Sequence, residues 1–229
     1  MCEQFVARSE RPFRIDRLFP FAESLERYGI AGFGWGAAWL TAPGSLETYR
    51  DVRAFRDDDG RTAIGRIETT SLLVHLRRPS LLSTLTLADT QPFADPAGRF
   101  AFSHNGDLRN YHAQREAFEA AGRIHGRADT EVGARWLEDA WRPDVPVPEL
   151  LGSLHRTFEG QANLAALTSD GTAYHYAGNL ENPVFEFRLG EVEIASTGVY
   201  SLDQSLFDLV IPAGRDRSRI NPGETAVLD

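Results

Sequence analysis

The sequence has little sulfur: one cysteine and one methionine in 229 residues. A lone cysteine cannot form a disulfide within the chain, so nothing indicates an oxidising compartment. No apolar run approaches the length that spans a bilayer, and residues 5–17 are too charged for the apolar core of a secretion signal. These absences predict a cytoplasmic protein without membrane contact.

Positive charge is also scarce. The chain has 24 Lys and Arg against 33 Asp and Glu, a formal net charge of −9. Because nucleic-acid affinity depends mainly on Lys and Arg, this balance argues against a protein that binds the phosphate backbone. The apolar and charged fractions are ordinary for a globular protein, and no repeat or linker is present. We therefore expect one domain over residues 1–229.

Hydrophobic patterning predicts strands, then helices, then strands. The expected strands are 32–40, 71–80, 100–104, a hairpin at 163–178, 191–197, 206–212 and 224–229. The expected helices are 16–28, 107–121, 129–141 and a segment after Pro148, while 53–65 is expected to be a loop or a hairpin and 81–99 a loop. This order predicts an α+β fold with α/β/β/α layers rather than repeated βαβ units.

Cys2, the single cysteine, directly follows Met1. Aminopeptidases remove an initiator Met that precedes a small side chain, which would leave a free α-amine on Cys2. Such an amine has a pKa of about 7.7–8.0 and can act as a base for its own thiol. The alternative is a cysteine that stands at position 2 by chance.

Asn105 and Gly106 lie between the strand expected at 100–104 and the helix expected at 107–121. They would form a tight turn whose side-chain amide and backbone N–H point at one spot, as in an oxyanion hole. The alternative is an ordinary Asn-Gly turn, since this dipeptide is common in turns.

His75 and Arg77 alternate onto one face of the strand expected at 71–80. Arg77 offers a planar fork for a carboxylate, although a half-exposed strand with a structural salt bridge would give the same pattern. Asp129 is expected at a helix N-terminus, where it or Thr130 would be the N-cap, and its carboxylate could also receive an ammonium group. The other histidines show no metal-ligand spacing, so we expect neither a metal site nor a cofactor.

Taken in order, five short motifs resemble the class II glutamine amidotransferases, a branch of the N-terminal nucleophile hydrolases. The motifs are Cys2, His-Leu-Arg at 75–77, Thr-Gln-Pro-Phe at 90–93, His-Asn-Gly at 104–106 and Asp-Thr-Glu at 129–131. The strand at 32–40 and the segment 194–214 are similar to further parts of stand-alone members. The resemblance implies a four-layer αββα sandwich over the whole chain, with Met1 removed.

The resemblance also implies roles for six residues. Cys2 would attack the γ-amide carbonyl of a glutamine-like substrate, and Asn105 and Gly106 would hold the oxyanion. The substrate-binding residues would be Arg77 for the α-carboxylate, Asp129 for the α-ammonium and, as a weaker candidate, Ser80. His104 would be a scaffold residue. The chain departs from the family pattern at Gln91, where a His is common, and at Ser103 and Ala128.

Three functions follow from this resemblance. The first is an amidohydrolase that cleaves glutamine or a γ-glutamyl compound through a Cys2 thioester; because no synthase domain follows in the sequence, the chain resembles stand-alone members. The second is a glutaminase subunit that supplies ammonia to a separate synthase. The third, less favoured, is a regulatory module that binds glutamine without turnover. The expected partners are a small-molecule substrate and, for the second function, a synthase, with no nucleic acid or membrane.

Overall fold

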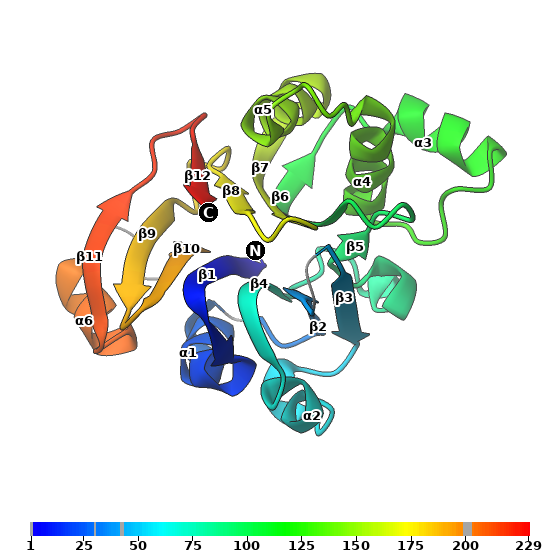
Figure 1. The fold of residues 1–229 in the computed structure, drawn as a ribbon. Coiled ribbons are helices and arrows are strands. Elements are labelled where there is room, and N and C mark those ends of the chain that lie inside the picture. The colour runs from blue at the N-terminus through cyan, green and yellow to red at the C-terminus, as the bar shows by residue number, and fades with distance from the viewer. Residues whose placement is uncertain (1, 30, 42–43, 199–202) are drawn as a thin grey trace.

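Two antiparallel sheets form the centre of the computed structural model, which describes residues 2–29, 31–41, 44–198 and 203–229 (Figure 1). Within these ranges the larger sheet has seven strands, in the order β11 (Gly214–Arg219), β9 (Val184–Leu189), β10 (Val192–Thr197), β1 (Glu3–Arg14), β4 (Glu68–Leu76), β2 (Trp35–Leu40) and β3 (Leu46–Asp51). The smaller sheet has five, in the order β12 (Thr225–Leu228), β8 (Ala173–Tyr176), β7 (Gly160–Thr168), β6 (Phe100–Leu108) and β5 (Phe93–Ala94).

Helices cover the outer face of each sheet. The larger sheet carries α1 (Phe19–Gly29), α2 (Arg61–Gly65) and α6 (Gln204–Val210), whose apolar side chains join one buried cluster with β1, β2 and β4. The smaller sheet carries α4 (Asp129–Ala140) and α5 (Val147–Phe158), with α3 (His112–Ala120) beside α4 (Figure 1). The four layers confirm the predicted αββα sandwich. No helix in the described ranges is long and apolar enough to cross a membrane.

Small side chains separate the two sheets. The cluster between them combines a few larger residues with six alanines: Val6, Leu73, Leu167, Leu228, Ala38, Ala101, Ala165, Ala173, Ala195 and Ala226. Close to this cluster, buried Gln4 accepts a hydrogen bond from Ser103 Oγ (2.8 Å), and its Nε2 lies 3.0 Å from His175 Nε2. These contacts fix the start of β1, and therefore the backbone that follows Cys2, against the opposite sheet.

The alternation predicted for β4 is confirmed. Leu72, Val74 and Leu76 pack under the outer helices, whereas Leu73 packs between the sheets. The hairpin expected at 163–178 is also confirmed, as β7 and β8 around Asp170-Gly171.

The strand predicted at 206–212 is wrong, because this segment lies largely in α6. Asp203 caps the helix by accepting a hydrogen bond from the backbone N–H of Leu206 (2.9 Å), and Phe207 and Val210 are buried on its inner face. A short run of apolar residues does not distinguish strand from helix, and here the cap decided for the helix. Residues 199–202, part of the family-like segment 194–214, lie outside the described ranges.

Other boundaries differ as well. The loop or hairpin expected at 53–65 contains α2 and a 3-10 turn at Phe55–Asp57, and the strand expected from residue 32 begins at Trp35. Five of the described strands were not predicted: β1, β3, β5, β9 and β11. The loop expected at 81–99 contains two 3-10 turns, at Leu82–Thr84 and Leu87–Asp89, and the short strand β5.

The turn predicted at Asn105-Gly106 is also wrong, because β6 continues to Leu108. Asn105 pairs with Asn163 and Gly106 with Ala162 across the ladder to β7. Consequently the following helix starts at His112 rather than at residue 107. Gly106 has a φ of 131° and passes so close to β7 that a Cβ placed there would lie 1.6 Å from the carbonyl oxygen of Gln161. The Asn-Gly pair therefore serves a close strand contact rather than a turn.

Candidate active site

A cleft of about 820 Å³ opens where the two sheets meet at the N-terminal end of the chain. Figure 1 places this end at the centre of the view, between the sheets. Five of the six residues singled out in the sequence line the cleft: Cys2, Arg77, Ser80, Gly106 and Asp129. The sixth, Asn105, is fully buried next to Gly106. The fold thus brings together residues that are up to 127 positions apart (Cys2 to Asp129).

The Cys2 thiol contacts the end of β4. Its Sγ accepts a hydrogen bond from the backbone N–H of Arg78 (3.3 Å) and lies 3.5 Å from the carbonyl oxygen of Arg78. Burial raises the pKa of the thiol, and this effect outweighs the Arg78 N–H and the nearby Arg77 charge, which lower it. Because the thiolate is the nucleophile, such a thiol needs a base close by.

Asn105 connects the smaller sheet to Cys2. Its Nδ2 donates a hydrogen bond to the carbonyl oxygen of Cys2. Since an amide nitrogen carries two hydrogens, a second one remains for another acceptor. Its Oδ1 has no hydrogen-bond partner within the described ranges.

Arg77 lines the cleft, and one of its guanidinium nitrogens has no hydrogen-bond partner among the described residues. Its Nη2 donates to Thr84 Oγ1 (2.9 Å), whereas the buried Nη1 makes no hydrogen bond to any described residue. Burial lowers the pKa of Arg77, although an arginine stays charged in proteins. A buried cation with an unused donor is favourable only if an anion is bound there.

The last part of β4 and the residue that follows it, Arg77, are buried. His75 is 0% exposed and Arg77 is 4% exposed. Desolvation lowers the pKa of His75 to about 3, so the ring is neutral at physiological pH. The alternative of a half-exposed strand with a structural salt bridge does not describe this geometry, since no ion pair of Arg77 occurs within the described residues.

Asp129 is the first residue of α4, not its N-cap. The cap position is Ala128, so the predicted cap at Asp129 or Thr130 is wrong. Asp129 Oδ2 accepts from the backbone N–H of Leu108 (2.8 Å), and Oδ1 accepts from that of Thr130 (2.9 Å). A carboxylate has about four acceptor sites, so both oxygens keep the capacity to accept from an ammonium group. Ser80 lies at the exposed rim of the cleft.

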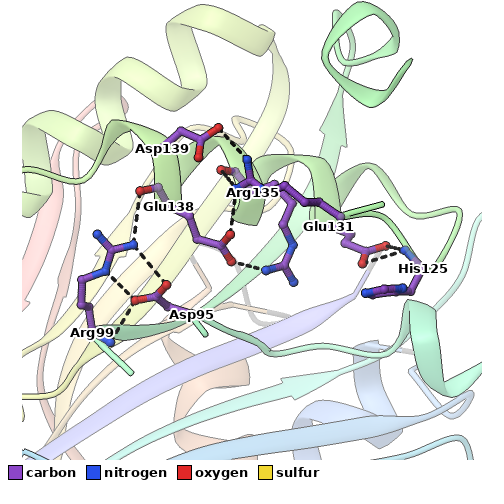
Figure 2. Close-up of polar contacts among 8 residues, drawn as sticks. Asp95, Arg99, His125, Glu131, Arg135, Glu138 and Asp139 are labelled. Atoms are coloured by element: carbon purple, nitrogen blue, oxygen red, sulfur yellow. Dashed lines mark hydrogen bonds and ion pairs between the residues drawn. The ribbon is translucent and has the colours of Figure 1, made fainter. Parts of the chain in front are cut away.

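Glu131, the last residue of the Asp-Thr-Glu motif, holds the loop in front of α4. Its buried carboxylate accepts from the backbone N–H of His125 (3.0 Å, Figure 2) and, in addition, from that of Gly126 (2.7 Å). Further along the same helix, Glu138 and Asp139 form ion pairs with Arg123 and Arg135. The carbonyl oxygen of Glu138 also accepts a hydrogen bond from Arg99, which pairs with Asp95 in the β5–β6 connection (Figure 2). Glu131 is therefore a structural residue that fixes the approach to Asp129.

Gln91, which stands where the family often has His, joins three parts of the site. Its Oε1 accepts from the backbone N–H of His104 (2.6 Å), and its Nε2 donates to Thr130 Oγ1 (3.0 Å). His104 Nδ1 lies 3.1 Å from the same hydroxyl, and burial lowers the pKa of His104. These contacts describe a neutral scaffold histidine.

Some residues of the cleft were not expected from the sequence. Thr84 comes from the segment 81–89, in which no motif was recognised, and Gln161 and Asn179 come from β7 and the connection after β8. Asp89 accepts from the backbone N–H groups that precede Asp129, including that of Ala128 (2.7 Å). No local pattern marks these residues, because only the packing of the two sheets brings them to the cleft. Within the described ranges, no group of three or more His, Cys, Asp or Glu could hold a metal ion.

Glu3, next to Cys2, is a buried carboxyl group. It accepts hydrogen bonds from Thr197 Oγ1 and from Asn182 Nδ2 (3.4 Å). Desolvation nevertheless raises its pKa from 4.5 to about 7. The stability that Glu3 contributes is therefore full below pH 4.5 and is lost as the pH rises through about 7.

We expect Glu3→Gln to remove this pH dependence. Because one pKa unit corresponds to about 1.4 kcal/mol, the variant should gain roughly 2–3 kcal/mol in free energy of unfolding relative to the wild type between about pH 5 and pH 8. Urea unfolding at several pH values measures the difference. Glu10→Gln, at an exposed position of the same strand, is the control and should show no such trend. A difference between Glu3→Gln and wild type that stays constant with pH would contradict the expectation.

Comparison with known proteins relates part of the chain to a known domain family. Residues 77–170 match the model of the glutamine amidotransferase domain. The glutamine–fructose-6-phosphate aminotransferase of Thermus thermophilus is 44% identical over 63 residues, which are 25% of this chain and 10% of that protein. The enzyme of the same name from Mycobacterium tuberculosis is 27% identical over 176 residues, 71% of this chain and 27% of that protein. The chain thus spans a minor part of these relatives.

Solved structures share the fold. The glutamine phosphoribosylpyrophosphate amidotransferase of B. subtilis superposes with a TM-score of 0.75 at 16% identity, over 99% of this chain and 47% of that one. A glutamine aminotransferase class-II domain protein from Silicibacter pomeroyi superposes with a TM-score of 0.61 at 16% identity, over 99% of this chain and 98% of that one. The chain therefore shares the fold of these amidotransferase structures over nearly its whole length, and residues 77–170 match the glutamine amidotransferase domain.

Proposed function

We propose that residues 1–229 form one amidohydrolase domain that cleaves the γ-amide bond of glutamine or of a γ-glutamyl compound. The observation that carries this proposal is the unused guanidinium nitrogen of Arg77, in the cleft that also contains the Cys2 thiol and the Asp129 carboxylate. A free amino-acid head is a zwitterion and needs one cation and one anion near the nucleophile. Arg77 would bind its α-carboxylate and Asp129 its α-ammonium group.

The proposed reaction proceeds through a thioester. Removal of Met1, which lies outside the described residues, frees the α-amine of Cys2. This amine takes the thiol proton as Sγ attacks the γ-carbonyl carbon, and it then passes the proton to the departing ammonia or amine. Water attacks the thioester, the α-amine accepts a proton from that water, and the released sulfur regains a proton. Asn105 and the backbone N–H of Gly106 stabilise the oxyanion of both tetrahedral intermediates.

The intact mass tests this proposal before and after incubation with 6-diazo-5-oxo-norleucine, a reactive glutamine mimic. We expect a chain without Met1 and an adduct that peptide mapping places on Cys2. An adduct on another residue, or none on a chain without Met1, would contradict the assignment of Cys2.

Arg77→Ala tests the substrate site separately. Loss of hydrogen bonds to a charged group is worth about 1.5–3 kcal/mol, so the KM for glutamine should rise roughly 10- to 100-fold while kcat changes less. Steady-state ammonia release measures both constants, and thermal unfolding checks that the variant is folded. Arg77→Lys, which keeps the charge but loses the fork, should give an intermediate KM. An unchanged KM in folded Arg77→Ala would contradict the role of Arg77.

A second function, ammonia supply to a separate synthase, is favoured by one observation. Four leucines are exposed in the segment that contributes Leu81, Thr84 and Asp89 to the cleft, namely Leu81 (63%), Leu82 (74%), Leu85 (36%) and Leu87 (51%). A partner protein could cover this apolar group. Glutaminase activity that appears only on addition of a partner would support this alternative, and full activity of the isolated chain would contradict it.

A further inference from the structure

The cleft extends well beyond the groups that would hold a glutamyl head. Its volume of about 820 Å³ lies in the upper part of the range of pockets that enclose drug-sized ligands. Ammonia, the leaving group of glutamine, needs almost none of this space. The other residues that line the cleft therefore indicate what the space beyond Arg77 and Asp129 would bind.

Arg78 is the most distinctive of these residues. It lines the cleft, its side chain is exposed, and its backbone N–H lies 3.3 Å from Cys2 Sγ. Its guanidinium makes no hydrogen bond or ion pair with any residue in the described part of the chain, although acidic residues outnumber basic ones by 33 to 24. An arginine fork without a protein partner can bind a carboxylate with two parallel hydrogen bonds.

The position of Arg78 relative to Arg77 assigns it to the leaving group. The two residues directly follow β4, and Arg77 is buried whereas Arg78 is exposed, so their side chains form different parts of the cleft lining. If Arg77 binds the α-carboxylate, the glutamyl half of the substrate lies on its side of the sulfur. The half that leaves then lies towards Arg78 and towards Leu81, an exposed apolar residue that lines the same cleft.

We propose that Arg78 selects γ-glutamyl substrates whose leaving amine carries a carboxylate, as in a γ-glutamyl amino acid. This inference rests on the proposed function. The reaction consumes one water: the γ-amide C–N bond breaks, a C–O bond forms, and glutamate and a free amino acid result. The leaving nitrogen takes the proton that the Cys2 α-amine received from the thiol, so no further co-reactant is needed.

The test compares kcat/KM for γ-glutamylglycine, which has an anionic leaving group, with kcat/KM for γ-glutamylethylamide, whose leaving group is neutral. The wild-type chain should favour γ-glutamylglycine about tenfold, as expected for one charge-assisted interaction. Arg78→Gln should bring the ratio of the two kcat/KM values close to one, and Arg78→Lys should give an intermediate ratio. Arg127→Gln is the matched control, because Arg127 is another exposed arginine of the cleft but lies next to Ala128 and Asp129. It should change the ratio by less than about twofold.

The outcomes separate this inference from the proposed function. If the chain cleaves glutamine or γ-glutamylethylamide, and Cys2 is labelled, but γ-glutamylglycine is not preferred, the selection by Arg78 is wrong and the proposed function stands. The inference is also overturned if Arg78→Gln leaves the ratio of the two kcat/KM values unchanged, or if Arg127→Gln lowers that ratio equally. If none of the three compounds is cleaved and Cys2 is not labelled, both proposals fail.

Discussion

Cys2→Ala should lose ammonia release from glutamine by roughly 10⁴-fold or more, because no other group in the site can form the thioester. The side chain is partly buried and its hydrogen-bonding contacts are to the backbone of Arg78, so its loss should cost no more than about 1 kcal/mol in free energy of unfolding. Activity assays and urea unfolding on the same preparation measure the two effects independently.

The terminus needs its own control in this experiment. Cys2→Ser, like Cys2→Ala, keeps a small residue after Met1, but it replaces the thiol by a hydroxyl, a weaker nucleophile. Intact mass must show the same N-terminus in wild type, Cys2→Ala and Cys2→Ser. Full activity in folded Cys2→Ala would exclude thioester chemistry at this position.

Gly106→Ala should have the second largest effect, and on folding as well as on turnover. A Cβ would lie 1.6 Å from the carbonyl oxygen of Gln161, and the φ of 131° is outside the range that side chains tolerate. Because strain and overpacking both apply, we expect a loss of roughly 3 kcal/mol or more in free energy of unfolding. In the fraction that folds, a displaced oxyanion donor should lower kcat about 10²- to 10³-fold.

The chain offers a matched control for Gly106→Ala. Gly122 also has a positive φ (69°), but no atom lies within 4 Å of the Cβ that would be added there. Gly122→Ala should therefore lose only about 1 kcal/mol, from the backbone conformation alone, and should keep its activity. Equal losses in the two variants would show that the contact with β7 does not matter. Unchanged kcat in Gly106→Ala would remove the residue from the oxyanion site.

The sequence predicted those elements whose local pattern agrees with their final packing. The alternation of Leu72, Leu73 and Val74 places successive side chains on opposite faces of β4, and the structure has them in two different clusters. The helix after Pro148 and the hairpin around Asp170-Gly171 were recognisable for the same reason. In each case the local periodicity or turn signal is also the one that the tertiary structure uses.

Predictions failed where local signals and tertiary contacts disagree. Asn105-Gly106 has the composition of a turn, but pairing with β7 extends the strand through it. The segment 206–212 has the composition of a strand, but the cap at Asp203 and burial of Phe207 make it a helix. The full burial of His75 could not be foreseen either, because it depends on the second sheet.

The sequence by itself determined that a single thiol stands at position 2 and which motifs follow it in order, and these sufficed to predict the αββα fold and the resemblance to glutamine amidotransferases. Only the tertiary structure decided what surrounds that thiol. Three features arise where the two sheets meet. They are the Arg77 nitrogen without a hydrogen-bond partner, the exposed side chain of Arg78 beside buried Arg77, and the close contact of Gly106 with β7. Contacts of this kind join residues far apart in the chain, so no local pattern of amino acids encodes them.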